Sequence, residues 1–202
     1  MSEIVKLSEL DDNQVTQAID VFIDGFYNVF NSVTKDKAKL HNLFKHSFDY
    51  EMVYTYLHNG DVLGFLGLAT HQKRPIKLSK AAFAEIMSGF AGKMAFKSMG
   101  AAIEKINVNS PDEVCIDYIA TSSEHRSKGI GKKLIEFVRD NLGYKHIKLE
   151  VFSKNPRAKA FYERIGFTTA GTKSGLMLSL MGHGKTIAMR MDVEKSNEHS
   201  GN

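Results

Sequence analysis

The part of the chain that most constrains its fold is a strand, a glycine-containing loop and a helix in direct succession. The run EVCIDYIA, residues 113–120, predicts a strand, and HRSKGIGKKL, residues 125–134, follows it. Gly129 and Gly131 stand two apart, just before an apolar helical pattern. Glycine loses more conformational freedom on folding than any other residue, so its paired use at one junction needs a reason. The candidate reason is a phosphate that lies against bare backbone.

A helix start suits a phosphate because its first N–H groups lack partners and the helix dipole is positive there. Gly129 and Gly131 remove side chains that would hold a ligand away, and Arg126 and Lys128 add positive charge. Together they predict a pyrophosphate cradle. The loop is not the dinucleotide fingerprint, whose final glycine is Leu134 here, and no stretch matches the Walker loop. Taken alone, the two glycines favour a structural turn over a phosphate site.

The rest of the chain alternates between helical and strand patterns, which indicates one α/β or α+β domain with a mixed sheet over residues 1–193. The residues at 194–202 form a polar tail that we expect to be disordered. The elements expected before the glycine loop are a strand at 4–7, a helix from Asp11 or Asp12, a helix carrying Leu40 and Phe44, a hairpin about Asn59-Gly60, and a helix over 81–106. Those expected after it are a helix over 129–142, a strand over 144–151, a helix over 157–165 and two strands ending near Val193.

Composition excludes several classes of protein. The 202 residues are 43% hydrophobic and 25% charged, as in ordinary soluble domains, and no apolar run reaches the ~18 residues of a membrane-spanning helix. The single cysteine, Cys115, favours a reducing compartment, and residues 1–10 lack the apolar core of a secretory signal, so we expect a cytoplasmic protein. The net charge of +4 is spread among alternating lysines and acids, so no nucleic-acid partner is expected. The eight histidines lack metal-ligand spacing, and we expect no metal.

A second motif, downstream of the glycine loop, supports a ligand-binding role for the loop. LEVFSKNPRAKAFYERIGF, residues 149–167, predicts a strand end, an Asn-Pro turn and a helix with Phe161-Tyr162 near its end. Residues 126–131 have the form [QR]-x-x-G-x-[GA], and residues 155–167 the form N-P-x-A-x-x-F-Y-x-x-x-G-F. Together these motifs resemble the GNAT superfamily of acyl-CoA-dependent N-acetyltransferases. The resemblance is specific over 113–167, and upstream only the order of elements agrees.

The resemblance implies the GNAT fold, a mixed and mostly antiparallel central sheet flanked by helices. It also implies a helical insertion here, between the third and fourth strands. In the family, the matching loop binds the CoA pyrophosphate through backbone N–H groups, and the strand end at 119–121 splays from its neighbour and pairs with pantetheine. Ser123, where many members have proline, is a departure outside the cradle. The residues thus assigned to acetyl-CoA are Ile119, Ala120, Thr121, Arg126, Ser127, Lys128, Gly129, Ile130, Gly131, Asn155 and Lys159.

Amine acetylation needs two proton movements. An alkyl amine, with a pKa near that of lysine (about 10.4), must lose a proton before it attacks, and the thiolate leaving group must be protonated or stabilised. Tyr162 matches the family's tyrosine acid, although a core tyrosine would give the same pattern. Glu150 precedes Tyr162 by twelve positions, as the base does in the ribosomal-protein alanine acetyltransferases, but a solvent-facing glutamate is equally compatible. Asp117 is a charge within an apolar strand and a second candidate base, whereas Cys115 occupies the position of the histone-acetyltransferase glutamate.

The sequence therefore predicts transfer of an acetyl group from acetyl-CoA to a primary amine by direct attack, in a monomer or homodimer. The alternative is a GNAT-fold module that binds acyl-CoA without transferring it, as a sensor or scaffold. The acceptor amine stays open. The segment at 81–106, rich in Met, Phe, Ala and Gly, is expected to form a wall of the acceptor pocket through Phe90 and Met94, or else to cap the sheet or make a dimer contact.

Overall fold

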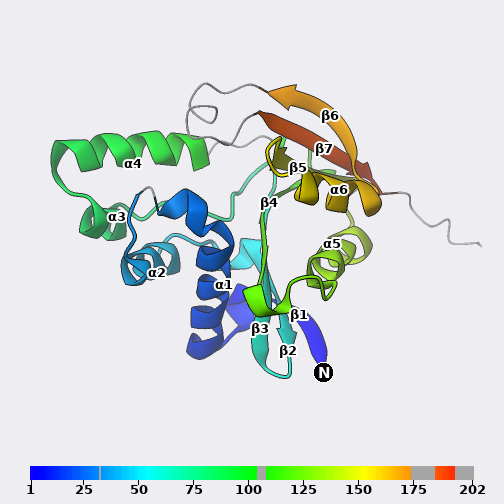
Figure 1. Ribbon diagram of the computed structural model, residues 1–202, viewed down its shortest axis with the longest axis horizontal. Coiled ribbons are helices and arrows are strands. Elements are labelled where there is room, and N and C mark those ends of the chain that lie inside the picture. Colours follow the sequence, from blue (N-terminus) through cyan, green and yellow to red (C-terminus); the bar gives the residue numbers. More distant parts are fainter. Residues whose placement is uncertain (32, 104–107, 174–184, 194–202) are drawn as a thin grey trace, which may run out of the picture.

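The described residues form a seven-stranded sheet with helices on both faces (Figure 1). The structure is a computed structural model that describes residues 1–31, 33–103, 108–173 and 185–193. The strand order is β1-β2-β3-β4-β5-β7-β6, and every neighbouring pair is antiparallel except β4 and β5. This confirms the predicted mixed, mostly antiparallel sheet. The tail at 194–202 lies outside the described residues.

The elements follow the predicted order. The first half of the chain contains β1 (Ser2–Lys6), η1 (Leu7–Glu9), α1 (Asp12–Phe30), α2 (Lys37–Lys45), η2 (Tyr50–Met52), β2 (Val53–His58), β3 (Asp61–Ala69), α3 (Lys80–Ile86) and α4 (Gly89–Ile103). The second half contains β4 (Glu113–Thr121), η3 (Ser123–His125), α5 (Ile130–Asn141), β5 (His146–Phe152), α6 (Pro156–Arg164), β6 (Thr168–Lys173) and β7 (Thr186–Asp192).

Local sequence explains why these elements begin and turn where they do. Asp11 accepts a hydrogen bond from the backbone N–H of Gln14 at 2.8 Å, and the Gln14 side chain accepts from the Asp11 N–H, which completes a capping box at the start of α1. Asn59 and Gly60 both have positive φ, 53° and 90°, as a two-residue hairpin turn between β2 and β3 requires.

The segment 81–106, which the sequence predicts to be helical, is interrupted in the structure. The described part of this segment forms two helices, α3 and α4, because Met87 has extended backbone and Gly89 takes a left-handed φ of 72°. Residues 104–107 lie outside the described residues. The two helices still form the predicted insertion between the third and fourth strands.

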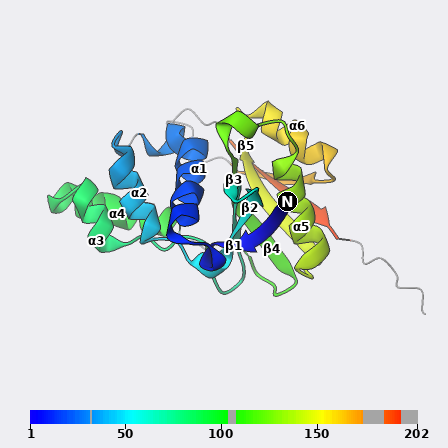
Figure 2. The ribbon, with the colours of Figure 1, turned by 90° about the horizontal axis from the view of Figure 1, so that it is seen from below.

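Helices lie on both sides of the sheet (Figures 1 and 2), and a cluster of buried apolar side chains lies on each side. Helices α1 to α4 lie on one side, where the Phe22 ring of α1 contacts a cluster of aromatic rings, those of Phe26, Phe30, Phe44, Phe48, Phe65 and Tyr118. Aromatic pairs of this kind add about 0.5–1.5 kcal/mol each to their burial, so these rings serve the core. Helices α5 and α6 lie on the other side, over the side chains of Leu66, Ile116, Ile147, Leu149 and Met189.

The two central strands of the sheet, β4 and β5, separate halfway along β4. Strands β4 and β5 pair in parallel from Glu113 with His146 to Ile116 with Leu149, and in the described residues their pairing ends there. The second half of β4 stays paired with β3 alone. The splay that the resemblance implies is therefore present, and it opens beside the start of α5 and α6.

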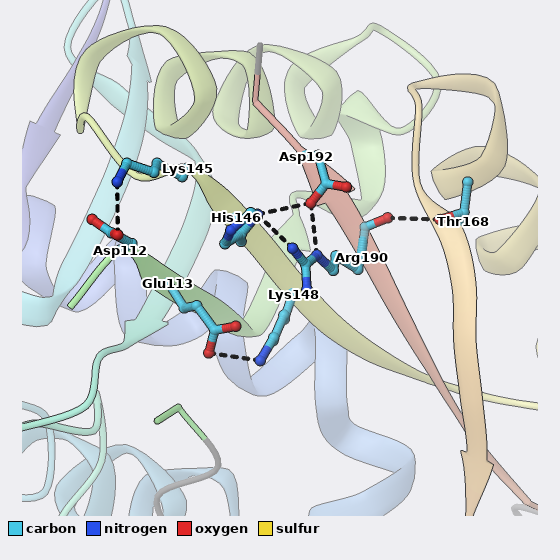
Figure 3. A network of polar contacts seen from close by, with 8 residues as sticks. All are labelled: Asp112, Glu113, Lys145, His146, Lys148, Thr168, Arg190 and Asp192. Atoms are coloured by element: carbon cyan, nitrogen blue, oxygen red, sulfur yellow. Dashed lines mark hydrogen bonds and ion pairs between the residues drawn. The ribbon is translucent and has the colours of Figure 1, made fainter. Parts of the chain in front are cut away.

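The face of β5 and β7 turned away from α5 is polar (Figure 3). Ile147 and Leu149 are buried beneath α5, whereas His146 and Lys148 alternate with them on the opposite face. There, Arg190 and His146 share Asp192, with Arg190 Nε at 2.6 Å and His146 Nδ1 at 2.7 Å from its carboxylate, and Lys148 pairs with Glu113 at 2.7 Å. The charged side chains on this face are thus paired with one another.

Candidate functional site

A pocket of about 740 Å³ lies where the splayed end of β4 meets the starts of α5 and α6. Ten of the twelve residues that the motifs assign to acetyl-CoA or to the acid line this pocket, and they come from β4, from the loop before α5, from the first turn of α5, and from α6 and its cap. His125 of η3, which was not assigned a role, also lines it. The predicted residues that line the pocket are Ile119, Ala120, Thr121, Arg126, Ser127, Gly129, Ile130, Gly131, Asn155 and Tyr162.

Four of the predicted site residues are not in the wall of this pocket: the two candidate bases, Asp117 and Glu150, and two of the residues assigned to acetyl-CoA. Lys159 lies on α6 and pairs with Glu163 one turn further along the same helix. Lys128 lies in the glycine loop but is absent from the pocket wall among the described residues. The sequence reasoning missed three basic residues that do line it: Lys132, Arg157 and Arg164. Arg157, Phe161 and Arg164 follow one another at helical spacing, which is the signal that could have found the two arginines.

The start of α5 has no side-chain cap in the described part of the chain, unlike the starts of four other helices. Side chains of Asp11, Asp36, Ser79 and Asn155 accept backbone N–H groups at the starts of α1, α2, α3 and α6. In the described residues, α5 follows Gly129 with no side-chain cap. Its first N–H groups are therefore left for another acceptor, and they border the pocket.

The backbone before α5 accounts for Gly129 but not for Gly131. Gly129 has a φ of 79° and Ser127 a φ of 65°, both in the left-handed region, so the loop turns sharply into the helix. At Gly131, an added Cβ would meet the Phe161 ring at 3.5 Å and Ile119 Cδ1 at 3.9 Å, which are ordinary contact distances. The chain's own packing therefore does not require a glycine at 131. Its absent side chain leaves space inside the pocket.

Helix α6 supplies a phenol and two arginines to the same pocket. The Tyr162 ring packs against Phe161 and Phe167, with centroids 5.3 and 5.8 Å away, and burial raises the pKa of its hydroxyl to about 12. This phenol keeps its proton at neutral pH and can donate it. Arg157 Nη2 donates to Ser127 Oγ at 3.3 Å, which links α6 to the glycine loop.

Both candidate bases lie where β4 and β5 part. Asp117 follows Ile116, and Glu150 follows Leu149, the last pair joined between the two strands. Glu150 is exposed and contacts Lys173 Nζ at 3.2 Å. Asp117 is buried, and its carboxylate lies 2.8 Å from Arg74 Nε in an ion pair.

The surroundings of Asp117 perturb its proton affinity. Desolvation raises the pKa of this carboxyl to about 6, and the charge of Glu150 adds to the rise. The charge of Arg74 and a hydrogen bond from the Cys115 thiol act in the opposite direction. Desolvation also raises the pKa of Cys115 far above its usual value, so this thiol stays protonated and is no nucleophile.

The insertion turns Phe90 and Met94 outward. Phe90 is 81% exposed and Met94 54%, and neither lines the pocket described above. Helix α4 attaches to the core through other residues, with Phe96 against Phe83 at a centroid distance of 5.6 Å. The expected acceptor wall at Phe90 and Met94 stays a prediction.

Comparison with known proteins agrees with the geometry. The family model described as "Acetyltransferase (GNAT) family" matches residues 16–167. The chain belongs to this family. Solved structures share the fold across the whole chain: the ribosomal-protein-S18-alanine N-acetyltransferase from Escherichia coli covers 100% of both chains at 17% identity with a TM-score of 0.55. An N-acetyltransferase from Staphylococcus aureus covers 94% of this chain and 100% of its own at 14% identity, with a TM-score of 0.60.

Two curated relatives are N-acetyltransferases. A "5-NmdU N-acetyltransferase" from Pseudomonas phage PaMx11 is 38% identical over 68 residues, which cover 34% of this chain and 48% of the relative. A "[Ribosomal protein bS18]-alanine N-acetyltransferase" from Salmonella typhimurium is 31% identical over 85 residues, 41% of this chain and 57% of the relative. The chain thus spans about half the length of the curated relatives that it matches.

The described residues offer neither a metal site nor a membrane-spanning helix. They contain no group of three or more His, Cys, Asp or Glu side chains able to hold a metal ion. None of the helices in the described part of the chain has the length and hydropathy needed to cross a bilayer.

Proposed function

We propose that this protein transfers the acetyl group of acetyl-CoA to a primary amine of an acceptor by direct attack on the thioester. The observation that carries the proposal is one pocket that joins the uncapped start of α5 to the splayed end of β4. A pyrophosphate and a peptide-like arm are the two parts of CoA that these features suit.

The start of α5 would hold the pyrophosphate. Backbone N–H groups at a helix start, the helix dipole and nearby cations all favour an anion, and Arg126, Lys132 and Arg157 line the same pocket. The arm of the cosubstrate would lie along residues 119–121. These residues pair with β3 on one side, so their other edge offers backbone groups toward the splay.

Tyr162 and Asp117 are suited to the two proton movements. A phenol with a pKa of about 12 remains protonated at neutral pH, as a donor to the leaving thiolate must. A carboxyl with a pKa of about 6 is mostly ionised at pH 7 to 8 and still binds a proton more readily than an ordinary aspartate. Glu150, on the other strand of the splay, is the second candidate base.

The acceptor classes to test first come from the names of the relatives. One relative is named for 5-NmdU and the other for the alanine of ribosomal protein bS18. These names motivate two arms of an acceptor screen: 5-NmdU as the free nucleoside, and a peptide with an N-terminal alanine. Polyamines, aminoglycosides and free amino acids complete the panel.

The test is release of free CoA from acetyl-CoA in the presence of each amine, with the acetylated product identified by its mass. The proposal predicts at least one amine that raises CoA release above the hydrolysis rate, with equal amounts of CoA and acetylated amine. Acetyl-CoA binding without transfer to any amine would favour the non-catalytic alternative. Failure of the protein to bind acetyl-CoA at all would contradict the proposed pyrophosphate cradle.

A further inference from the structure

Arg74 lies outside both motifs, in the connection between β3 and α3, yet most of its side chain is shielded from solvent. Its side chain is 13% exposed and that of Asp117 is 7% exposed, with Arg74 Nε 2.8 Å from Asp117 Oδ2. A buried ion pair gains little stability over an apolar pair of similar size, because both charges lose their hydration. The position of this pair beside the splay suggests a role other than stability.

The β4 strand is bulged at Asp117. Gly67 pairs with Tyr118, and the next residue of β3, Leu68, pairs with Ile116, so Asp117 is the extra residue of β4. A bulge re-aims side chains, and bulges often lie next to active sites. Here the Asp117 carboxylate accepts a hydrogen bond from the Cys115 thiol and shares the Arg74 guanidinium with the Tyr118 hydroxyl.

The segment that carries Arg74 is fastened at several points. The Asp49 N–H donates to the Pro75 carbonyl at 2.9 Å, the Lys77 N–H donates to the Ser47 carbonyl at 2.8 Å, and Phe48 forms a bridge with Ile76. Pro75 also packs closely over β3, because a Cβ at Gly67 would lie only 3.2 Å from the proline ring. Arg74 is therefore delivered to the bulge by a fixed piece of backbone.

We infer that Arg74 is a positioning residue that fixes the Asp117 carboxylate at the mouth of the splay and keeps it ionised, ready to accept the proton of the acceptor amine. The inference rests on the proposed acetyl transfer and names the residue that prepares its base. Arg74 acts through Asp117 and needs no contact with either substrate.

The charges around Asp117 determine in which direction its pKa changes when the charge of Arg74 is removed. The titratable groups that face it are Arg74 from the connecting segment, Cys115 and Tyr118 from β4, and Glu150 from β5. Of these, Arg74 makes the largest contribution in favour of the ionised carboxylate. Removing its charge leaves desolvation and Glu150 unopposed except by the thiol, so the pKa of Asp117 must rise.

The test compares Arg74→Gln, Arg74→Lys and wild type in two measurements: the pH profile of kcat/KM with one amine, and the titration of the Asp117 carboxyl by carbon NMR. The ionisation of the amine is the same for every variant, so differences report the enzyme. In Arg74→Gln, both the acid limb of the profile and the NMR titration should move up by about 1–3 pH units, as expected for loss of an opposite charge at this distance. Arg74→Lys retains the charge and should keep both close to wild type.

Three further variants serve as controls and as a fallback if Arg74→Gln does not fold. Asp117→Asn should abolish the acid limb and lower kcat/KM by ~10²-fold or more. Glu150→Gln should retain the acid limb but move it to lower pH, because the charge of Glu150 raises the pKa of Asp117. Arg139→Gln, which removes an exposed arginine paired with Asp140, should leave the profile unchanged.

Each outcome decides one point. A raised NMR titration in Arg74→Gln with an unmoved acid limb would overturn the inference while acetyl transfer stands, because Asp117 would then not be the base. An unchanged NMR titration of Asp117 in Arg74→Gln would mean that the ion pair has a structural role and does not set the pKa of Asp117. A wild-type profile in Asp117→Asn would likewise overturn it. If wild type binds acetyl-CoA but acetylates no amine, the proposed function fails, and the inference fails with it.

Discussion

The pH dependence of folding stability should carry the signature of Asp117. Burial raises the pKa of this carboxyl from 3.8 to about 6, against the opposing charge of Arg74. The folded state therefore binds this proton more tightly than the unfolded state does. The stabilising contribution is complete below about pH 4 and is lost as the pH rises through 6. At ~1.36 kcal/mol per pKa unit, a rise of about two units corresponds to roughly 3 kcal/mol.

The perturbation is Asp117→Asn, which cannot titrate, and the assay is urea unfolding between pH 4 and 7.5. The free energy of unfolding of wild type minus that of the variant should fall by roughly 3 kcal/mol across this range. At any single pH the two differ also because the variant leaves the Arg74 charge without its carboxylate, so only the slope is diagnostic. Asp140→Asn, at an exposed carboxylate paired with Arg139, is the matched control.

Two results would refute this reasoning. Parallel stability curves for wild type and Asp117→Asn would mean that the folded protein holds the Asp117 proton no more tightly than the unfolded chain does. A difference that grows with pH would mean that the Arg74 charge outweighs desolvation, with the pKa of Asp117 depressed.

Three further predictions concern the pocket and its frame. Gly131→Val should weaken acetyl-CoA binding by ~10-fold or more, about 1.4 kcal/mol, in calorimetry, with thermal stability near wild type, since its Cβ meets the Phe161 ring only at 3.5 Å; unchanged affinity in the folded variant would contradict the cradle. Tyr162→Phe should lower kcat by ~10²–10⁴-fold with little change in acetyl-CoA affinity, and a wild-type kcat would exclude the phenol as the acid. Gly25→Ala should destabilise the fold by ~1–3 kcal/mol in urea unfolding, because the added methyl would lie 2.6 Å from Ala120 Cβ, and full stability would show that α1 can move off β4.

Local patterns predicted most of the fold because its elements carry strong local signals. The Asn59-Gly60 turn, the cap at Asp11 and the alternation in β5 each fix an element within a few residues. The glycine loop could be placed between a strand and a helix for the same reason. The break between α3 and α4 was harder to place, because Gly89, Gly92 and Gly100 all stand in that segment and only Gly89 takes the left-handed backbone.

The candidate site was predictable where the motif is contiguous and not where it depends on long-range pairing. Asp117 stood out as a charge in an apolar strand, but its partner Arg74 lies 43 positions earlier, and a bulge brings them together. No periodic pattern in the sequence predicts a contact between residues so far apart. Lys159, which the resemblance assigned to acetyl-CoA, pairs with Glu163 on α6, and its role in cofactor binding stays a prediction.

A crystal structure of the protein with acetyl-CoA bound tests the central claim most directly. The account predicts a pyrophosphate that accepts hydrogen bonds from the backbone N–H groups at 129–131, a pantetheine arm along the free edge of 119–121, and a thioester end near the point where β4 and β5 part. Acetyl-CoA bound in another part of the molecule, or a pyrophosphate away from the start of α5, would contradict it.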